Sequence, residues 1–230
     1  MVLKGSDALL EPKRVLIVGG SPEPSSVALV VSLANQSDAV VAVDRGLDIL
    51  TTANVACDMF CGDADSVSER GAVHVRACEE GACGLIGHVE RYNPHKDFTD
   101  LDLALRAVEE RWPGAFVTCT CLTGGNPDHA LAVYGRLAAY RGGGVELRED
   151  DFCARVLHGP SSLNITGSAG KRFSFVPLSS ETVVSERGMR WELDHVRVAL
   201  LSDLGISNVI ESDIATFSCH EGVVATWLFG

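Results

Sequence analysis

Short apolar runs alternate with segments of helical period over the first part of the chain. The apolar runs cover residues 14–18, 39–43, 59–61, 115–122 and 145–148. Glycine, aspartate or other turn-forming residues end most of them. Repeated strand, turn and helix predict a parallel sheet with helices on both faces. We therefore expect a parallel α/β domain over residues 14–149.

The segment from Thr99 to Trp112 has the clearest helical pattern, because its apolar residues recur with a period of about 3.6. Thr99 and Asp102 form a capping-box pattern, with a hydroxyl at the N-cap and an acid three residues later. Pro113-Gly114 ends this helix.

Other segments give weaker helical signals. Asn126 is followed by Pro127, which suits the first turn, so a helix is expected from there to about Tyr140. Shorter helices are expected up to Asn35 and from Leu47 to Ala53. The glycines within residues 67–96 indicate hairpins or loops instead.

The pattern changes after about residue 150, where no long helical period remains. Short β-prone segments separated by Gly, Pro and Ser cover residues 152–157, 161–166, 172–177, 182–185, 214–219 and 223–229. Such a series predicts a second, all-β domain, a β-sandwich over residues 150–230.

Composition narrows the class of protein. A formal net charge of −12 argues against a nucleic-acid-binding surface. No apolar run approaches the ~18 residues of a membrane-spanning helix. Residues 1–13 lack a secretory apolar stretch and suggest a loose leader, so we expect a cytoplasmic protein without a membrane partner.

The cysteines fit a reducing compartment. None of the eight falls in a Cys-x-x-Cys pair, which a structural zinc site would favour. Buried, reduced thiols are therefore expected.

Glycines and acids gather where the predicted strands end. One strand ends at Gly19-Gly20, one at Asp44, one at Gly62-Asp63 and one at Thr123-Gly124. In open α/β sheets, ligands bind outside the carboxyl ends of the strands. The sequence therefore predicts a ligand site at this edge.

Asp63 and Asp65 follow an apolar run and are one residue apart. Two such carboxylates can converge on a hard cation such as Mg²⁺. A solvated turn is the alternative, because Asp, Gly and Ser are all turn formers.

A second constellation is the segment from His95 to Asp100, at the start of the helix predicted from Thr99. Backbone N–H groups at a helix N-terminus favour anions, and Lys96 could meet a phosphate. Asp97 and Asp100 could join Asp63 and Asp65 around magnesium. Helix capping alone would explain Thr99 without any ligand.

A third constellation, Thr123-Gly124-Gly125-Asn126-Pro127-Asp128-His129, also leads from a strand into a helix. Its two glycines allow the backbone to approach a ligand closely. Asp128 and His129 could orient a sugar hydroxyl or a phosphate, although an ordinary surface histidine is the alternative. No P-loop, dinucleotide fingerprint or Gly-x-Ser-x-Gly elbow is present.

Four motifs together resemble the catalytic domain of the thiamin pyrophosphokinase family. They are Asp44-Arg45-Gly46, Gly62-Asp63-Ala64-Asp65-Ser66, Lys96-Asp97-Phe98-Thr99-Asp100 and Gly124-Gly125-Asn126-Pro127-Asp128-His129. The β-rich tail resembles that family's thiamin-binding domain through the segments 173–178, 188–193 and 205–208.

The resemblance implies a Rossmann-like catalytic domain that transfers pyrophosphate from ATP to thiamin, giving AMP and thiamin diphosphate. It implies a homodimer with composite active sites and Mg²⁺ as cofactor. By position, the resemblance implies a magnesium and phosphate site formed by Asp44, Asp63, Asp65 and Asp100. Of these, the implied catalytic acids are Asp63, Asp65 and Asp100. The implied nucleotide contacts are Gly20, Asp44, Lys96, Asp97, Thr99, Gly124, Gly125 and Asp128. The implied thiamin contacts are Ser207, Asn208 and Trp191.

Two further functions are compatible with the same residues. A magnesium-dependent phosphohydrolase would use the acids on water, and a non-catalytic thiamin- or nucleotide-binding protein would retain the fold without turnover. The second alternative is motivated by Asn126, because the family usually has an Arg two residues before the Asp-His pair.

Overall fold

A computed structural model describes residues 13–82, 84–92 and 98–230. The predicted leader, Lys96 and Asp97 lie outside these residues. The helices are α1 (Val27–Ala34), α2 (Gly46–Ala53), α3 (Glu69–Glu79), α4 (Asp100–Arg111) and α5 (Pro127–Ala139). The strands up to residue 150 are β1 (Arg14–Val18), β2 (Ala39–Val43), β3 (Met59–Gly62), β4 (Val89–Arg91), β5 (Phe116–Thr120) and β6 (Val145–Glu149). The later strands are β7 (Phe152–His158), β8 (Ser161–Thr166), β9 (Arg172–Pro177), β10 (Thr182–Arg187), β11 (Leu193–Val198), β12 (Asn208–Val209), β13 (Ile214–Glu221) and β14 (Val223–Phe229).

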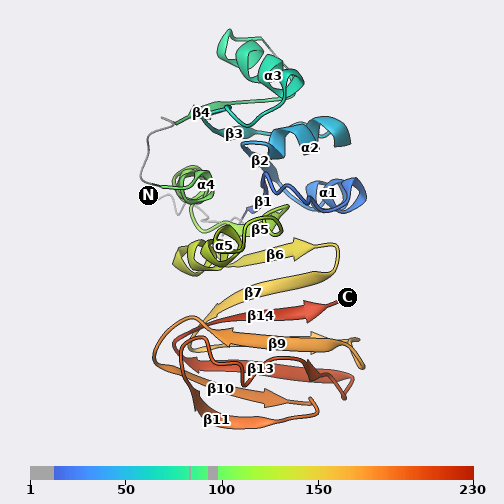
Figure 1. The fold of residues 1–230 in the computed structure, drawn as a ribbon, viewed down its shortest axis with the longest axis vertical. Coiled ribbons are helices and arrows are strands. Elements are labelled where there is room, and N and C mark those ends of the chain that lie inside the picture. The colour runs from blue at the N-terminus through green and yellow to red at the C-terminus, as the bar shows by residue number, and fades with distance from the viewer. Residues whose placement is uncertain (1–12, 83, 93–97) are drawn as a thin grey trace, which may run out of the picture.

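One long sheet runs through the molecule (Figure 1). Its strand order is β12-β9-β14-β7-β6-β5-β1-β2-β3-β4. The part from β6 to β4 is parallel, whereas β7, β14, β9 and β12 join antiparallel to their neighbours. The parallel part confirms the α/β prediction, and its strands β1, β2, β3 and β5 are buried almost throughout.

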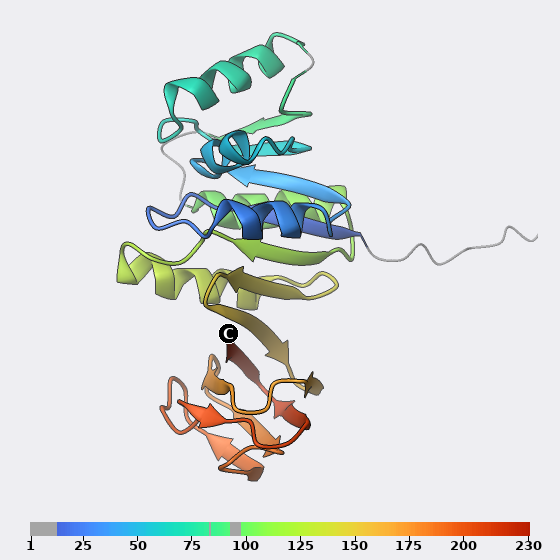
Figure 2. The same ribbon diagram turned by 90° about the vertical axis from the view of Figure 1, so that its right-hand side faces the viewer.

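Helices cover both faces of the parallel part (Figures 1 and 2). Alternate residues along β1 point to opposite faces, so Val15 and Ile17 pack with α4 and α5, while Leu16 and Val18 pack with α1 and α2. Within the described residues, no helix is long and apolar enough to cross a bilayer.

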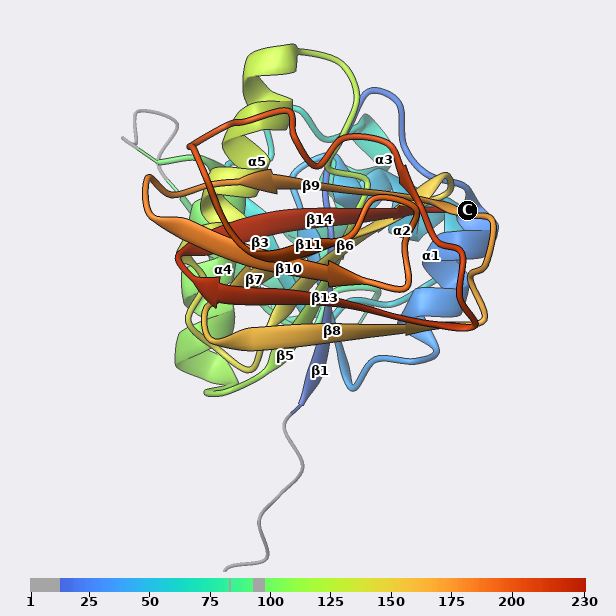
Figure 3. The same cartoon turned by 90° about the horizontal axis from the view of Figure 1, so that it is seen from below.

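The carboxyl-terminal part is a β-sandwich, as predicted. A second sheet, ordered β11-β10-β13-β8, packs on the β7, β14 and β9 part of the long sheet (Figure 3). Phe217 of the small sheet packs against Phe173 and Phe175 of the long one, with ring centroids 5.6 and 5.0 Å apart. One layer of the sandwich is therefore the continuation of the sheet of the α/β domain, a relationship that the strand pattern did not predict.

The capping prediction at α4 is confirmed in part. The side chain of Thr99 accepts a hydrogen bond from the backbone N–H of Asp102, at 3.3 Å. The Asp102 carboxylate forms ion pairs with Arg106 and Arg136, both at 2.9 Å. The acid of the predicted capping box thus links α4 to α5.

The interpretation of residues 67–96 as hairpins or loops was wrong, because α3 lies within them. Ser68 caps this helix, accepting from the N–H of Gly71, and is itself bound by Asp48 of α2. Only Gly71 and Val75 of α3 are buried. So narrow an apolar stripe produces a weak periodic signal.

Three strands, β4, β11 and β12, were also absent from the predicted set. β12 is only two residues long, and half of the residues of β11 are exposed. The cysteines that the structure describes are free thiols, and most are buried, as expected.

Candidate active site

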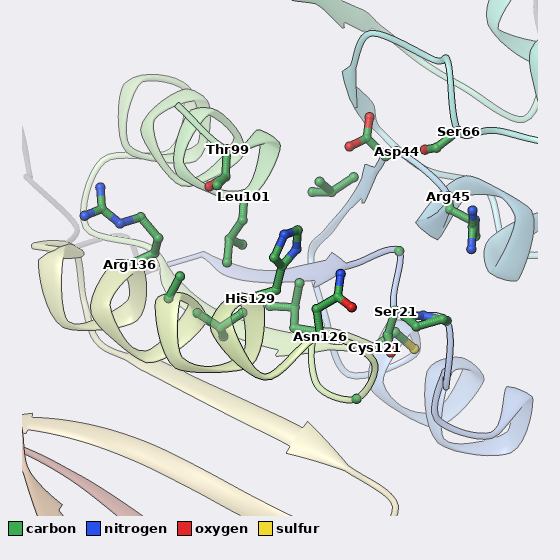
Figure 4. Close-up of a pocket in the computed structure, with 17 residues that line it drawn as sticks. Ser21, Asp44, Arg45, Ser66, Thr99, Leu101, Cys121, Asn126, His129 and Arg136 are labelled. Carbon is green, nitrogen blue, oxygen red and sulfur yellow. The ribbon is translucent and has the colours of Figure 1, made fainter. Parts of the chain in front are cut away.

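A cavity of about 460 Å³ opens at the carboxyl edge of the parallel sheet (Figure 4). The turn after β1 contributes Gly20 and Ser21 to its lining, and the turn after β2 contributes Asp44 and Arg45. Thr99 and Leu101 line it from the start of α4, and residues 126–136 line it from α5. This is the edge at which the sequence predicted a ligand site.

Asp44 and the turn after β3 form one corner of the site. The backbone N–H of Asp44 donates to the carbonyl of Cys61, at 3.1 Å. A Cβ atom at Gly62 would lie 2.0 Å from Oδ1 of Asp44, so only glycine lets this carboxylate approach the β3 backbone. The residue that follows Gly62 is Asp63, which brings two predicted acids to the same corner.

The Asp63–Asp65 segment is a turn. The backbone N–H of Asp65 donates to Oδ1 of Asp63, at 3.1 Å, and Ala64 has a left-handed φ of 62°. This is the Asx arrangement that turn-forming acids favour. The Asp63 carboxylate therefore stabilises the turn that it begins. Ser66, which follows this turn, lines the cavity.

The start of α4 approaches the same end of the sheet. Burial and the charges of nearby carboxylates, Asp100 among them, raise the pKa of the Cys61 thiol to about 12. The negative charge of Asp100 therefore lies near the end of β3. Thr99, which caps α4, lines the cavity.

The Thr123–Asn126 loop packs against the loop that follows β1. Gly124 and Gly125 have φ angles of 97° and 67°. A Cβ atom at Gly125 would lie 2.6 Å from Cγ of Pro22. Gly124, Asn126 and His129 line the cavity, whereas Gly125 supports the turn. The Asp128 carboxylate accepts a hydrogen bond from the backbone N–H of His129, at 3.0 Å.

Two arginines in the cavity wall were not among the predicted site residues. Arg45 follows Asp44, and Arg136 lies two turns after His129 on the same face of α5. His129, Ala132, Val133 and Arg136 recur at helical spacing, and that signal could have identified Arg136. Arg136 pairs with Asp102 at 2.9 Å, and both arginines place positive charge in the cavity wall.

The predicted thiamin contacts lie together at the other end of the long sheet. The side chain of Asn208 is buried and bonds to both backbone polar groups of Trp191, at 2.8 and 3.2 Å. Trp191 itself is 59% exposed, and Ser207 is exposed with a left-handed φ of 64°. The structure therefore presents Trp191 and Ser207 to solvent on a frame held by Asn208.

The two groups of residues are far apart in one chain. Strands β9, β14, β7, β6, β5 and β1 lie between β12 and β2 in the long sheet. At a strand spacing of ~4.8 Å, Asn208 and Asp44 are separated by roughly 30 Å. A small molecule at Trp191 cannot reach the acids of the same chain.

The acids suit magnesium in their chemistry. Among the described residues, no group of three or more His, Cys, Asp or Glu side chains converges as a ready metal cage. Mg²⁺ is usually held by one or two carboxylates together with substrate phosphates. The hard oxygen donors of Asp44 and Asp63, brought together by Gly62, fit that mode.

Comparisons with known proteins agree with this geometry. The sequence profile of the thiamin pyrophosphokinase catalytic domain matches residues 30–147. The profile of the thiamin pyrophosphokinase vitamin B1 binding domain matches residues 160–224. No curated protein sequence matches the chain.

Solved structures are similar over almost the whole chain. A thiamine pyrophosphokinase from Bacillus subtilis is 25% identical, with a TM-score of 0.77, and the match covers 94% of this chain and 99% of that one. A thiamin pyrophosphokinase from Candida albicans is 14% identical with a TM-score of 0.77, covering 96% and 90%, and supports the fold alone.

The two family profiles follow one another along the chain in the order of its α/β part and its sandwich. The first profile alone spans more than half of the sequence. The chain therefore belongs to the thiamin pyrophosphokinase family.

Proposed function

We propose that the cavity between α4 and α5 is where this enzyme transfers pyrophosphate from ATP to thiamin, with release of AMP. The observation that carries the proposal is the corner formed by Asp44, Gly62 and Asp63, of which Asp44 lines that cavity. The family profiles supply the reaction. They do not favour a phosphohydrolase or a non-catalytic binding protein.

The lining of the cavity supports one orientation of ATP. Leu101 and Arg136 lie toward one end, and Asp44, Arg45 and Ser66 toward the other (Figure 4). Val133 also lines the cavity. An apolar wall suits a purine base, whereas cations and a glycine turn suit phosphates. The triphosphate therefore lies toward Asp44, near the backbones of Gly20 and Gly124. Lys96, Asp97, Thr99, Gly125 and Asp128 complete the proposed nucleotide contacts.

Asp44, Asp63, Asp65 and Asp100 would hold Mg²⁺ at the phosphate end. When bound, the ion would offset the negative charge of the phosphates. Arg45 adds a fixed positive charge at the same end. An acidic protein can therefore accept ATP, because the substrate arrives with its own cation.

The chain's residues position the two reactants for transfer. The hydroxyl oxygen of thiamin attacks the β-phosphorus, and the bond from that phosphorus to the bridging oxygen of the AMP moiety breaks. The hydroxyl proton passes to a carboxylate, either Asp63 or Asp100. Most of the rate enhancement then comes from alignment and charge neutralisation.

A homodimer with composite sites follows from the separation of the two residue groups. Trp191, Ser207 and Asn208 of one chain lie roughly 30 Å from the acids of the same chain on the strand-spacing estimate. Thiamin held there must meet the acids of a partner. The loop before Ser207 exposes Leu200, Leu201, Leu204 and Ile206, an apolar surface suited to contact with a second copy. We also expect this enzyme in the cytoplasm.

One incubation tests the reaction. The full chain is supplied with ATP, Mg²⁺ and thiamin, and nucleotides and thiamin esters are separated by chromatography. AMP and thiamin diphosphate in equal amounts are the expected products. ADP with inorganic phosphate, formed with or without thiamin, would identify a hydrolase, and binding without any AMP would identify a non-catalytic protein.

A further inference from the structure

Glu149, the last residue of β6, is a carboxylate to which the proposed reaction gives no role. It accepts hydrogen bonds from three consecutive backbone N–H groups beyond the end of β5. Cys121 donates to its Oε2 at 3.0 Å, and Leu122 and Thr123 donate to its Oε1 at 3.0 and 3.2 Å. Both carboxylate oxygens are therefore engaged by one turn of the backbone.

Hydroxyl groups from two different loops complete this arrangement. Ser25, in the loop after β1, donates to Oε2 of Glu149 at 2.6 Å, and Thr123 donates its hydroxyl to Oε1 at 3.1 Å. The hydroxyl of Ser21 in turn donates to the carbonyl of Thr123. One side chain thus ties together the loop after β1 and the loop after β5, which form two walls of the ATP cavity.

A run of backbone N–H groups leaving a strand is an anion-binding feature. Here Glu149 fills it from within the protein, so these three amides are not available to phosphate. The next residues, Gly124 and Gly125, then turn with positive φ against Glu23 and Pro22. The carboxylate therefore fixes where the glycine turn stands at the cavity mouth.

We propose that Glu149 is a positioning residue for pyrophosphate transfer, which holds the Thr123–Gly125 turn at the spacing that MgATP requires. The inference rests on the proposed function of the cavity, because the turn matters only if nucleotide binds there. Glu149 acts through the loops and does not touch the substrate. Charge-assisted hydrogen bonds of this kind are the stronger ones, which suits a residue that must keep two loops in register.

Glu149→Gln is the informative variant, because it retains the shape and replaces one acceptor oxygen with an NH₂ group that faces N–H and O–H donors. We expect KM for MgATP to rise and kcat to fall, so that kcat/KM for MgATP drops about 10- to 100-fold. This is the size of effect expected for residues that orient site residues without touching the substrate. KM for thiamin should stay within about twofold, since the thiamin contacts lie at the other end of the sheet. Asp151→Asn, an exposed position in the same β6–β7 turn, is the matched control for loss of charge and should behave as wild type.

Calorimetric titration with MgATP gives a readout that does not depend on turnover. Wild-type binding with tenfold or greater weakening in the Glu149→Gln variant supports the inference, even if thiamin proves not to be the acceptor. Failure of wild type to make AMP while this binding difference persists would count against the proposed function alone. A folded Glu149→Gln variant with wild-type MgATP affinity and kinetics would overturn the inference. Equal increases in KM for MgATP and in KM for thiamin, accompanied by a lower Tm, would also overturn the inference.

Ser25→Ala covers the case in which the Glu149 variant does not fold. It removes the 2.6 Å hydrogen bond to Oε2 without altering a residue of the cavity wall. We expect a smaller change in the same direction, confined to KM for MgATP and kcat. No change in either constant would contradict a positioning role for the Glu149 carboxylate.

Discussion

The side-chain amide of Asn208 donates a hydrogen bond to the buried carboxyl of Glu186, at 3.1 Å. The same amide group donates to the carbonyl of Trp191, and its oxygen accepts from the N–H groups of Trp191 and Val209. Asn208 thus has its polar atoms engaged within the protein. It supports the backbone of the exposed Trp191, and Glu186 lies on β10 in the other sheet of the sandwich.

Glu186 should make stability depend on pH. Burial raises the pKa of its carboxyl from 4.5 to about 7, and the Asn208 hydrogen bond opposes this only in part. The native state therefore holds a proton that the unfolded chain has lost, so its contribution to stability is complete below about pH 4.5 and disappears as pH rises to about 7. Between pH 4.5 and 8, the free energy of urea unfolding should fall by about 3 kcal/mol more in wild type than in Glu186→Gln. Glu192→Gln, at an exposed position, is the control and should behave as wild type. The same pH dependence of unfolding free energy in all three proteins would contradict the prediction.

Asp63 and Asp65 are expected to act in catalysis and not in folding. Asp63→Asn or Asp65→Asn should lower kcat at least about 100-fold, because charge neutralisation at the phosphates is the main catalytic effect. Unfolding free energy should change by less than about 1 kcal/mol, as is typical of exposed turn positions. Steady-state kinetics over a range of Mg²⁺ concentrations checks the first expectation. Wild-type turnover in either variant would rule out the metal assignment.

Trp191 is expected to bind thiamin through its exposed indole. Thiamin is cationic and aromatic, so loss of the ring should raise KM for thiamin about 3- to 30-fold. Trp191→Ala should show this increase while KM for MgATP stays constant, and Trp191→Phe should recover part of the affinity. Equal effects on both substrates would point instead to a general structural defect.

The composite site can be tested by mixing two inactive variants. Asp63→Asn lacks the acid corner and Asn208→Ala lacks the support of the thiamin contact, so a hybrid dimer contains one site in which both are intact. After subunit exchange at equal concentrations, about a quarter of wild-type activity should return, because half of the dimers are hybrid and each has one working site of two. Mass spectrometry of the mixture must confirm exchange. An inactive mixture with confirmed hybrids would exclude sites shared between subunits.

Residues 1–149 alone should not form a stable domain. Removing β7 and β14 opens the edge of the sheet at β6 and strips α5 of its packing against the sandwich. In the full chain, the Trp227 indole donates to the hydroxyl of Tyr134 at 2.9 Å and their rings meet at 5.0 Å. Circular dichroism and gel filtration of this fragment should reveal loss of cooperative unfolding and aggregation. A monodisperse, cooperatively folded fragment would disprove this dependence.

The local elements of this protein were determined by the sequence itself. β2 is a continuous apolar run, β1 is apolar after Arg14, and Thr99 caps α4 where the pattern placed it. Such features depend on residues that are neighbours in the chain, so periodicity and turn chemistry are sufficient to predict them. The gathering of acids and glycines at strand ends follows from the same pattern, since parallel strands share one carboxyl edge.

Only the tertiary structure decided which distant residues meet. Arg136 belongs to the cavity because α4 and α5 pack side by side, and Glu149 controls a loop that lies more than twenty positions earlier in the chain. The continuation of the sheet from β6 through β7 to β12 sets Trp191 and Asp44 at opposite ends of the molecule. Strand order is determined by long-range pairing between backbones, which alternation of apolar and polar residues within a strand does not specify.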